Sequence, residues 1–185
     1  SCPPCSVGGL MQQTLQPDEI VICDDQSKDR TIDVIKNTLK YWNGNWRLIQ
    51  NSKNLGYKKN FQKVISLCQG DVIFLCDQDD VWLPEKIEKT LQLMLETQNR
   101  LLNDHPASPI PPIIAHTDLK VVDAELNPIC ESFWKMERID PALLRTFNQQ
   151  AGHNLVTGCT MLINKAARQS ALAHDSKRAL MHDVW

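Results

Sequence analysis

The stretch GDVIFLCDQDDVW, from Gly70 to Trp82, changes abruptly from apolar residues to a cluster of carboxylates. Its apolar part, Val72 to Cys76, is short, contains β-branched residues and follows a glycine, as is typical of a buried strand. Asp77, Asp79 and Asp80 then fall within four positions. The stretch therefore predicts a buried strand that ends in an acidic loop.

A second apolar segment of the chain ends in the same way. The sequence EIVIC, Glu19 to Cys23, is followed directly by Asp24 and Asp25. In open α/β sheets, ligands bind in the crevice beyond the carboxyl ends of the strands. Both acidic groups are therefore expected at that edge of one sheet.

Helical and strand patterns alternate along the chain, which predicts an α/β fold. The apolar spacing of helices is found at residues 32–42, at 61–68 and, after Pro84, at 87–95. Further strand patterns are found at residues 46–50, 113–123 and 155–164.

Length and composition indicate one globular domain. The chain has 185 residues, of which 42% are hydrophobic and 23% charged, with a net charge of −2. That balance gives no electrostatic footprint for nucleic acid, and no apolar run reaches the ~20 residues of a membrane span. Residues 1–9, SCPPCSVGG, do not resemble a secretory signal. Residues 104–112 are proline-rich and are expected to form a surface loop.

Seven cysteines favour a reducing, cytoplasmic compartment, because the number is odd and several of them lie in or beside apolar runs. Cys2 and Cys5 form a lone CxxC pair. Such a pair is redox-active or half of a zinc site in some proteins, but no second pair follows it here.

The two acidic groups suggest a metal site. Carboxylates this close repel one another unless a cation compensates their charge. Magnesium and manganese prefer such oxygen ligands and leave room for substrate phosphates. The sequence thus favours a platform for a diphosphate, and the alternative is a pair of solvated turns with helix caps.

Two other motifs compete for the same residues. An EF-hand loop starting at Asp77 fails, because Trp82 occupies the position that requires glycine. A haloacid-dehalogenase-like phosphohydrolase fits better, with Asp77 as nucleophile and Asp79 as acid/base. Chain order counts against it, because the only other acidic pair after a strand, Asp24 and Asp25, lies upstream.

Three segments in order resemble family 2 glycosyltransferases. They are LQPDEIVICDDQSKDRT at 15–31, the segment from NSKNLGYKKN to DQDDVWLPEKI at 51–87, and GCTMLINKAA at 158–167 with HDVW at 182–185. The resemblance covers about Leu10 to Trp185. It implies the GT-A fold, a Rossmann-like three-layer sandwich with a mixed, mainly parallel sheet. The subgroup with DQDDVW is described as rhamnosyltransferase-like.

The resemblance also implies roles for individual residues. Asp24 and Asp25 would lie at the nucleotide, with Lys59 as a basic contact. Asp77 would face the ribose. Asp79 would bind the divalent cation, manganese or magnesium, that bridges the diphosphate of a dTDP- or UDP-sugar.

Other residues would serve the acceptor. Asp183 falls where the family places the general base of an inverting transferase, which takes a proton from the acceptor hydroxyl. His182 could assist it, and Gly158 and Cys159 match a segment on the acceptor side. The acceptor would be a saccharide or a lipid-linked oligosaccharide at the inner face of the cell membrane, with the enzyme peripheral to that membrane.

The sequence departs from the family at both ends. SCPPCSVGG stands where the family has its first strand, and the chain stops at Trp185, where the family continues. We therefore expect a truncated catalytic domain without its first strand. A non-catalytic remnant of a glycosyltransferase is the alternative.

Overall fold

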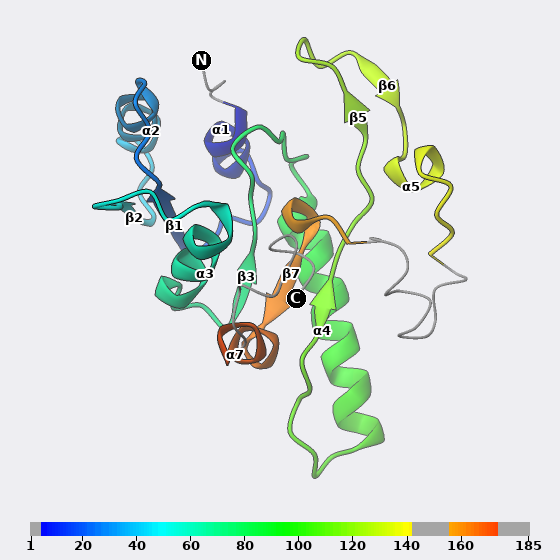
Figure 1. Cartoon of the computed structure of the whole chain (residues 1–185). Coiled ribbons are helices and arrows are strands. Elements are labelled where there is room, and N and C mark those ends of the chain that lie inside the picture. Colours follow the sequence, from blue (N-terminus) through cyan, green and yellow to red (C-terminus); the bar gives the residue numbers. More distant parts are fainter. Residues whose placement is uncertain (1–4, 142–155, 174–185) are drawn as a thin grey trace.

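The computed structural model describes residues 5–141 and 156–173 (Figure 1). The first half comprises α1 (Cys5–Met11), β1 (Glu19–Asp24), α2 (Thr31–Leu39), β2 (Asn45–Gln50), α3 (Tyr57–Leu67), β3 (Val72–Phe74) and α4 (Lys86–Asp104). The second half comprises β4 (Ile114–Ala115), β5 (Val121–Val122), β6 (Pro128–Cys130), α5 (Phe133–Met136), η1 (Gly158–Thr160), β7 (Leu162–Asn164) and α7 (Lys165–Ala173). The alternation of strands and helices confirms the predicted α/β class.

Some boundaries differ from the sequence predictions. The strand expected at Val72–Cys76 ends at Phe74, where the chain turns into the acidic loop. The strand expected over residues 113–123 is two separate short strands, β4 and β5. Residues 155–164 begin with the 3-10 turn η1, and only Leu162–Asn164 are strand.

The described strands form three separate sheets: the pair β1 and β2, the three strands β3, β7 and β4, and the pair β5 and β6. β1 pairs with β2 in parallel, from Glu19 opposite Asn45 to Asp24 opposite Gln50. β7 lies between β3 and β4 and is antiparallel to both, so β3 and β4 run in the same direction. β5 and β6 form a hairpin.

The beginnings of β1 and β3 are held together by the side chain of Glu19. Its carboxylate accepts a hydrogen bond from the Gln69 N–H at 2.9 Å, just before β3. It also pairs with Arg47 at 2.6 Å, and the same guanidinium nitrogen donates to the Leu67 carbonyl. β1 and β3 therefore start side by side, and the acidic residues that follow each of them emerge at one edge of the fold.

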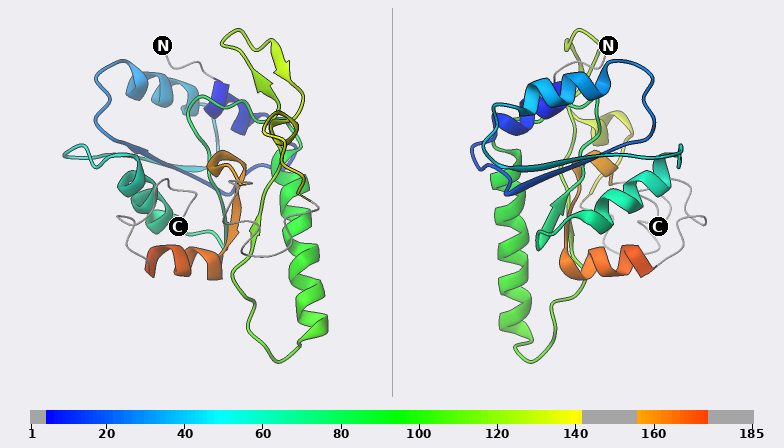
Figure 2. Two further views of the ribbon diagram at one scale, coloured as in Figure 1. Left: turned by 45° about the vertical axis from the view of Figure 1, so that its right-hand side comes forward. Right: turned by 90° about the vertical axis from the view of Figure 1, so that its left-hand side faces the viewer.

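Helices cover both faces of the strands. Figure 2 shows α1 and α2 on one face of β1 and β2, and α3 and α7 on the other. The main core lies between α3, β3, β7 and α7 and includes the buried residues Ile65, Leu75, Met161 and Ile163. A second cluster joins α4 to the sheet through Met94, Ala115 and Leu162.

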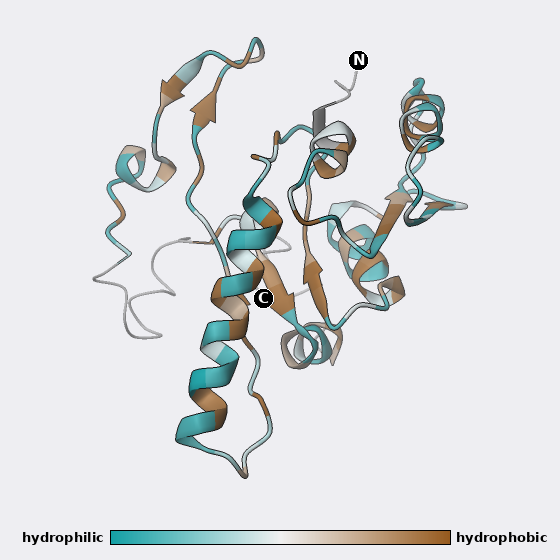
Figure 3. Ribbon diagram, turned by 180° about the vertical axis from the view of Figure 1, so that it is seen from behind, coloured by the Kyte–Doolittle hydropathy of each residue, from teal (hydrophilic) through white to brown (hydrophobic). Residues whose placement is uncertain are grey.

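The surface pattern of α4 agrees with that packing. Ile87, Thr90 and Met94 are buried at the spacing of one helix face. The rest of α4 is largely hydrophilic (Figure 3), although Leu93, Leu95 and Leu102 are exposed on it. Within the described ranges, no helix is both long and apolar enough to cross a membrane.

Candidate functional site

The carboxyl end of β1 carries the first acidic pair. Asp24 is buried, with 6% of its surface exposed. Both of its carboxylate oxygens accept a hydrogen bond from the Ser27 N–H at 3.3 Å, and its carbonyl accepts one from the Asn51 N–H at 2.9 Å. Asp24 therefore shapes the turn after β1 as well as lying at the expected edge.

Asp25 holds the loop that follows β2. Its carboxylate accepts hydrogen bonds from the N–H groups of Leu55 and Gly56, both at 2.8 Å, and from the Asn51 amide at 2.7 Å. Burial works against its charge, but these hydrogen bonds outweigh it and lower the pKa of Asp25 below its ordinary value. Gly56 has a φ of 76°, which favours glycine, and it begins α3. Asp25 thus fixes the entry of the chain into α3.

A lysine supports the same loop from within α3. Lys63 donates to the Asn51 side-chain oxygen at 2.6 Å, and the Asn51 amide donates to Asn60 at 2.8 Å and to Asp25. Lys59, the lysine singled out from the sequence, is exposed on α3. Lys63 was missed, because three lysines in this segment share a similar local context and only the fold separates them.

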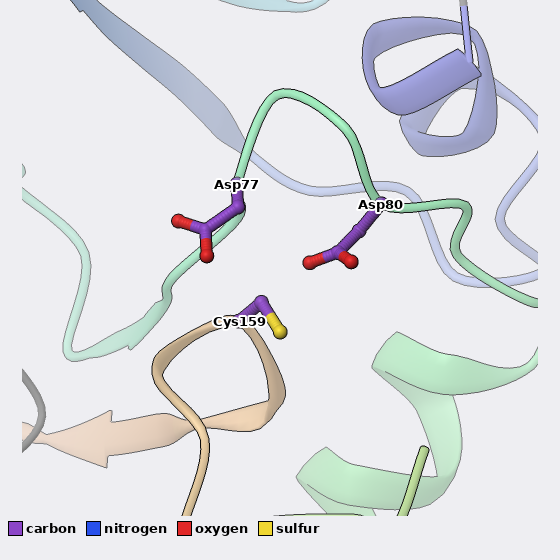
Figure 4. Close-up of side chains that lie close together, drawn as sticks. All are labelled: Asp77, Asp80 and Cys159. Carbon is purple, nitrogen blue, oxygen red and sulfur yellow. The ribbon is translucent and has the colours of Figure 1, made fainter. Parts of the chain in front are cut away.

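The loop after β3 brings Asp77 and Asp80 together with Cys159 of η1. A carboxylate oxygen from each aspartate and the sulfur of Cys159 lie within 4.8 Å of one another (Figure 4). Asp79 is exposed on the same loop and is not a member of this described group. The structure therefore brings Asp77 together with Asp80 and Cys159, while the predicted roles of Asp77 and Asp79 stay predictions.

Two protonated thiols line this cluster. Burial raises the pKa of Cys159, and a hydrogen bond to the Asp80 carboxylate raises it further. Burial and the charges of Asp80 and Asp77 raise the pKa of Cys76 to about 12. These raised pKa values mean that both sulfurs carry their protons at neutral pH.

The donors present fit a hard divalent cation. Oδ2 of Asp80 is buried without a hydrogen-bond partner among the described residues, and the Asp77 carboxylate lies beside it. A buried carboxylate oxygen without a partner is costly unless a cation or water satisfies it. Asp77 and Asp80 are thus the residues that could hold magnesium or manganese.

A positive charge also lies close to the cluster. Lys86, in the first turn of α4, lies over the ring of Trp82 at 4.9 Å from its centroid. Burial lowers the pKa of Lys86, and the charge of Asp80 opposes that shift. Sequence reasoning did not single out Lys86, although its position four residues after Trp82 places it beside that ring.

The acidic loop is fastened to α1 through Gln13. The Gln13 amide donates to the carbonyl oxygens of Leu83 at 2.9 Å and Gly9 at 3.1 Å, and its oxygen accepts from the Ile87 N–H at 3.0 Å. Trp82 is 5% exposed and packs against Phe74, with ring centroids 5.7 Å apart. Trp82 therefore packs in the core beneath the acidic loop.

The predicted acceptor-side residues fall into two groups. Gly158 and Cys159 are buried in η1, and Cys159 adjoins the acidic loop. Asp183, His182 and Cys2 lie outside the described residues. Their assignments stay predictions.

Comparison with curated proteins identifies relatives of this chain by sequence. "Uncharacterized protein Rv1520" of Mycobacterium tuberculosis is 30% identical over 146 residues, which are 77% of this chain and 39% of that protein. The glucosyltransferase WfgD of Escherichia coli, described as "UDP-Glc:alpha-D-GlcNAc-diphosphoundecaprenol beta-1,3-glucosyltransferase", is 26% identical over 49% of this chain and 35% of its own. The chain thus spans about two fifths or less of these relatives' lengths.

A solved structure shares the fold. The mannosyltransferase PcManGT from Pyrobaculum calidifontis, solved in complex with GDP-Man and Mn2+, has a TM-score of 0.58 and 12% identity, and the match covers 94% of this chain and 43% of that one. This likeness confirms the GT-A fold. The sequence model for "Glycosyl transferase family 2" matches residues 6–106 and includes both acidic strand ends, which contradicts the phosphohydrolase alternative. Because this match covers more than half of the 185 residues, the chain belongs to glycosyl transferase family 2.

Proposed function

We propose that the protein transfers a sugar from a nucleoside diphosphate to a cell-surface saccharide or lipid-linked acceptor, with inversion at the anomeric carbon. The observation that carries this proposal is the convergence of Asp77 and Asp80 around a buried, unpartnered carboxylate oxygen. Family membership supports it, because the cluster lies within the matched residues.

The acidic loop would bind the diphosphate end of the donor. Asp79 is exposed on this loop and stays our proposed ligand of manganese or magnesium, with Asp77 and Asp80 beside it. The cation would neutralise the charge that develops on the departing diphosphate. Asp77 would in addition face the ribose.

The end of β1 would bind the base of the nucleotide. Asp24 and Asp25 stand at the same edge as the acidic loop, since β1 and β3 begin side by side. Three hydrogen bonds already hold the Asp25 carboxylate, so its proposed contribution is to keep the pocket's loop in place. Lys59, exposed on α3, is the proposed basic contact.

The proton of the acceptor hydroxyl would pass to Asp183, with His182 close to it in sequence. Gly158 and Cys159 would border the acceptor. The name of the WfgD relative supports a lipid-linked acceptor. We propose rhamnose as the sugar, dTDP or UDP as the nucleotide, and the cytoplasmic face of the membrane as the location.

Calorimetric titration with UDP and with dTDP, each with and without manganese, tests the donor site. We expect manganese-dependent binding that falls at least about tenfold in Asp79→Asn and in Asp80→Asn, since each removes one negative ligand. Asp71→Asn is the matched control, because Asp71 is exposed at the amino end of β3, away from the acidic loop.

Two outcomes separate this proposal from its alternative. If the affinity for the nucleotide does not depend on manganese and is unchanged by these substitutions, the acidic loop is not a diphosphate site. A full-length protein that binds the nucleotide but transfers no sugar to an acceptor would favour the non-catalytic remnant. In that case Asp183→Asn would bind the nucleotide as well as its parent does.

A further inference from the structure

The acidic loop holds its carboxylates close together. A carboxylate oxygen of Asp77 and one of Asp80 lie within 4.8 Å of each other and of the Cys159 sulfur, and Asp79 adds a third carboxylate on the same loop. Like charges at such distances repel each other. Oδ2 of Asp80 is also buried without a hydrogen-bond partner among the described residues. This shape of the loop is therefore costly unless a positive charge compensates it.

A lysine of the neighbouring helix supplies a positive charge. The charge of Asp80 raises the pKa of Lys86 against the larger effect of burial. In turn, the charge of Lys86 favours the ionised forms of Cys76 and Cys159, although burial dominates and raises the pKa values of both thiols. An ammonium that acts on all three of these residues faces the interior of the cluster.

The ammonium of Lys86 has a fixed position. Its Nζ lies 4.9 Å from the centroid of the Trp82 ring, within the range of a cation–π interaction. That ring is buried and packs on Phe74. The next residue of α4, Ile87, donates its N–H to the Gln13 side chain at 3.0 Å. The tip of Lys86 and the backbone beside it are thus both held relative to the acidic loop.

Lys86 acts on the loop through space. Within the described ranges, the ion pairs are formed by other residues: Arg47 with Glu19, Lys89 with Glu85, and Lys120 with Glu131. The ammonium of Lys86 therefore offsets the charge of Asp80 without occupying its buried oxygen. Such an interaction is stronger in a half-buried site than at the surface, because water and salt screen it less.

The place of Lys86 in α4 indicates a role outside the helix. The first turn of a helix favours negative side chains, because the backbone N–H groups there carry a partial positive charge. Glu88 in the first turn of α4 follows this preference, whereas Lys86, the first residue of the helix, opposes it. The acidic loop, and not the helix, compensates this charge.

We propose that Lys86 is a fixed counter-charge of the acidic loop, a positioning residue that keeps the loop in shape when no cation is bound. The same charge repels a divalent cation that arrives alone and attracts a diphosphate. The cation therefore binds firmly only when the donor diphosphate supplies further ligands, so metal and nucleotide are retained and released together. This proposal rests on the proposed donor site and adds the residue that controls its occupancy.

The test measures two affinities in Lys86→Met, which removes the charge and keeps an unbranched side chain over Trp82. Titration with manganese alone, monitored by electron paramagnetic resonance of the free ion, should give an affinity about three- to tenfold higher than that of the parent chain, because a repelling charge is lost. Calorimetric titration with UDP in the presence of EDTA should give a lower affinity than that of the parent, because an attracting charge is lost.

Two further variants are controls. Lys86→Arg keeps a positive charge that can stack on the Trp82 ring, so both affinities should stay within about twofold of those of the parent. Lys89→Met removes the same charge from α4, but Lys89 is exposed and pairs with Glu85. It should therefore leave both affinities unchanged.

The opposite directions of the two changes distinguish this role from a structural one. Loss of both affinities in Lys86→Met would mean that Lys86 only supports the fold, and would overturn the proposal. A manganese affinity equal to that of the parent, or an equal rise in Lys89→Met, would overturn it as well but leave the donor site standing. If neither the parent nor Lys86→Met bound manganese, with or without UDP, the proposed donor site would itself be wrong.

Discussion

Replacing Asp25 by alanine should destabilise the protein by about 3 kcal/mol. The carboxylate accepts three hydrogen bonds at 2.7–2.8 Å, two of them from the backbone N–H groups of Leu55 and Gly56. A hydrogen bond to a charged group contributes about 1.5–3 kcal/mol, and water partly replaces those lost from a half-exposed loop, so we take about 1 kcal/mol for each. In a domain of this size the melting temperature should fall by about 6–12 °C.

The effect should also depend on pH. The pKa of Asp25 is lower in the folded protein than its ordinary value of 3.8, so its ionised form stabilises the fold above that value. This contribution is lost as the pH falls through the folded pKa. Urea denaturation at pH 7 and at successively lower pH should therefore show the two proteins converging below about pH 4.

Two matched variants sharpen the measurement. Asp25→Asn keeps one acceptor oxygen but turns an amide donor toward a backbone N–H, so it should lose about half as much stability as alanine. Asp71→Ala removes an exposed carboxylate and should change little. A loss below about 1 kcal/mol for Asp25→Ala, or a loss that is the same at pH 7 and pH 3, would refute the role of Asp25 as the anchor of this loop.

Three further predictions concern the packing around the site. Trp82→Ala should lower the free energy of unfolding, measured by urea titration, by about 3–5 kcal/mol. The ring is 5% exposed and packs on Phe74, so its removal leaves a cavity. A loss near zero would contradict that packing. The pKa of Cys76 is raised to about 12, so its thiol should resist iodoacetamide at pH 8 in the folded chain and react in urea. Mass spectrometry measures the labelling. Rapid labelling of the folded chain would contradict the burial of this thiol. Glu19→Gln weakens its bonds to Arg47 and Gln69 and should speed amide exchange at Gln69, and unchanged exchange would count against that link.

The sequence predicted the elements that follow strong patterns. EIVIC is β1 with one residue added, and the apolar spacing at 32–42, 61–68 and 87–95 corresponds to α2, α3 and α4. The acidic strand ends were also predicted, because an apolar run that stops at consecutive aspartates is a local signal. Periodicity and composition suffice for such features, since they depend on neighbours in the chain.

Other features depend on contacts between distant segments. Cys159 was expected on the acceptor side, but it joins Asp77 and Asp80 only because β7 pairs with β3, and no local pattern predicts that contact. Lys63 and Lys59 are equally plausible in sequence, but one turn of helix separates the lysine that reaches Asn51 from the exposed one. The split of residues 113–123 into β4 and β5 likewise reflects their different partners, β7 and β6.

The hydrogen bonds of Gln13 have a consequence for the order of folding. They join α1 to Leu83 and Ile87, which lie 70 and 74 positions further along the chain. Closing so long a loop costs entropy before the contacts compensate for it, and such contacts tend to form late. We therefore expect α3 and its neighbouring strands to consolidate first, and the acidic loop to take its native shape only when α1 docks on the start of α4.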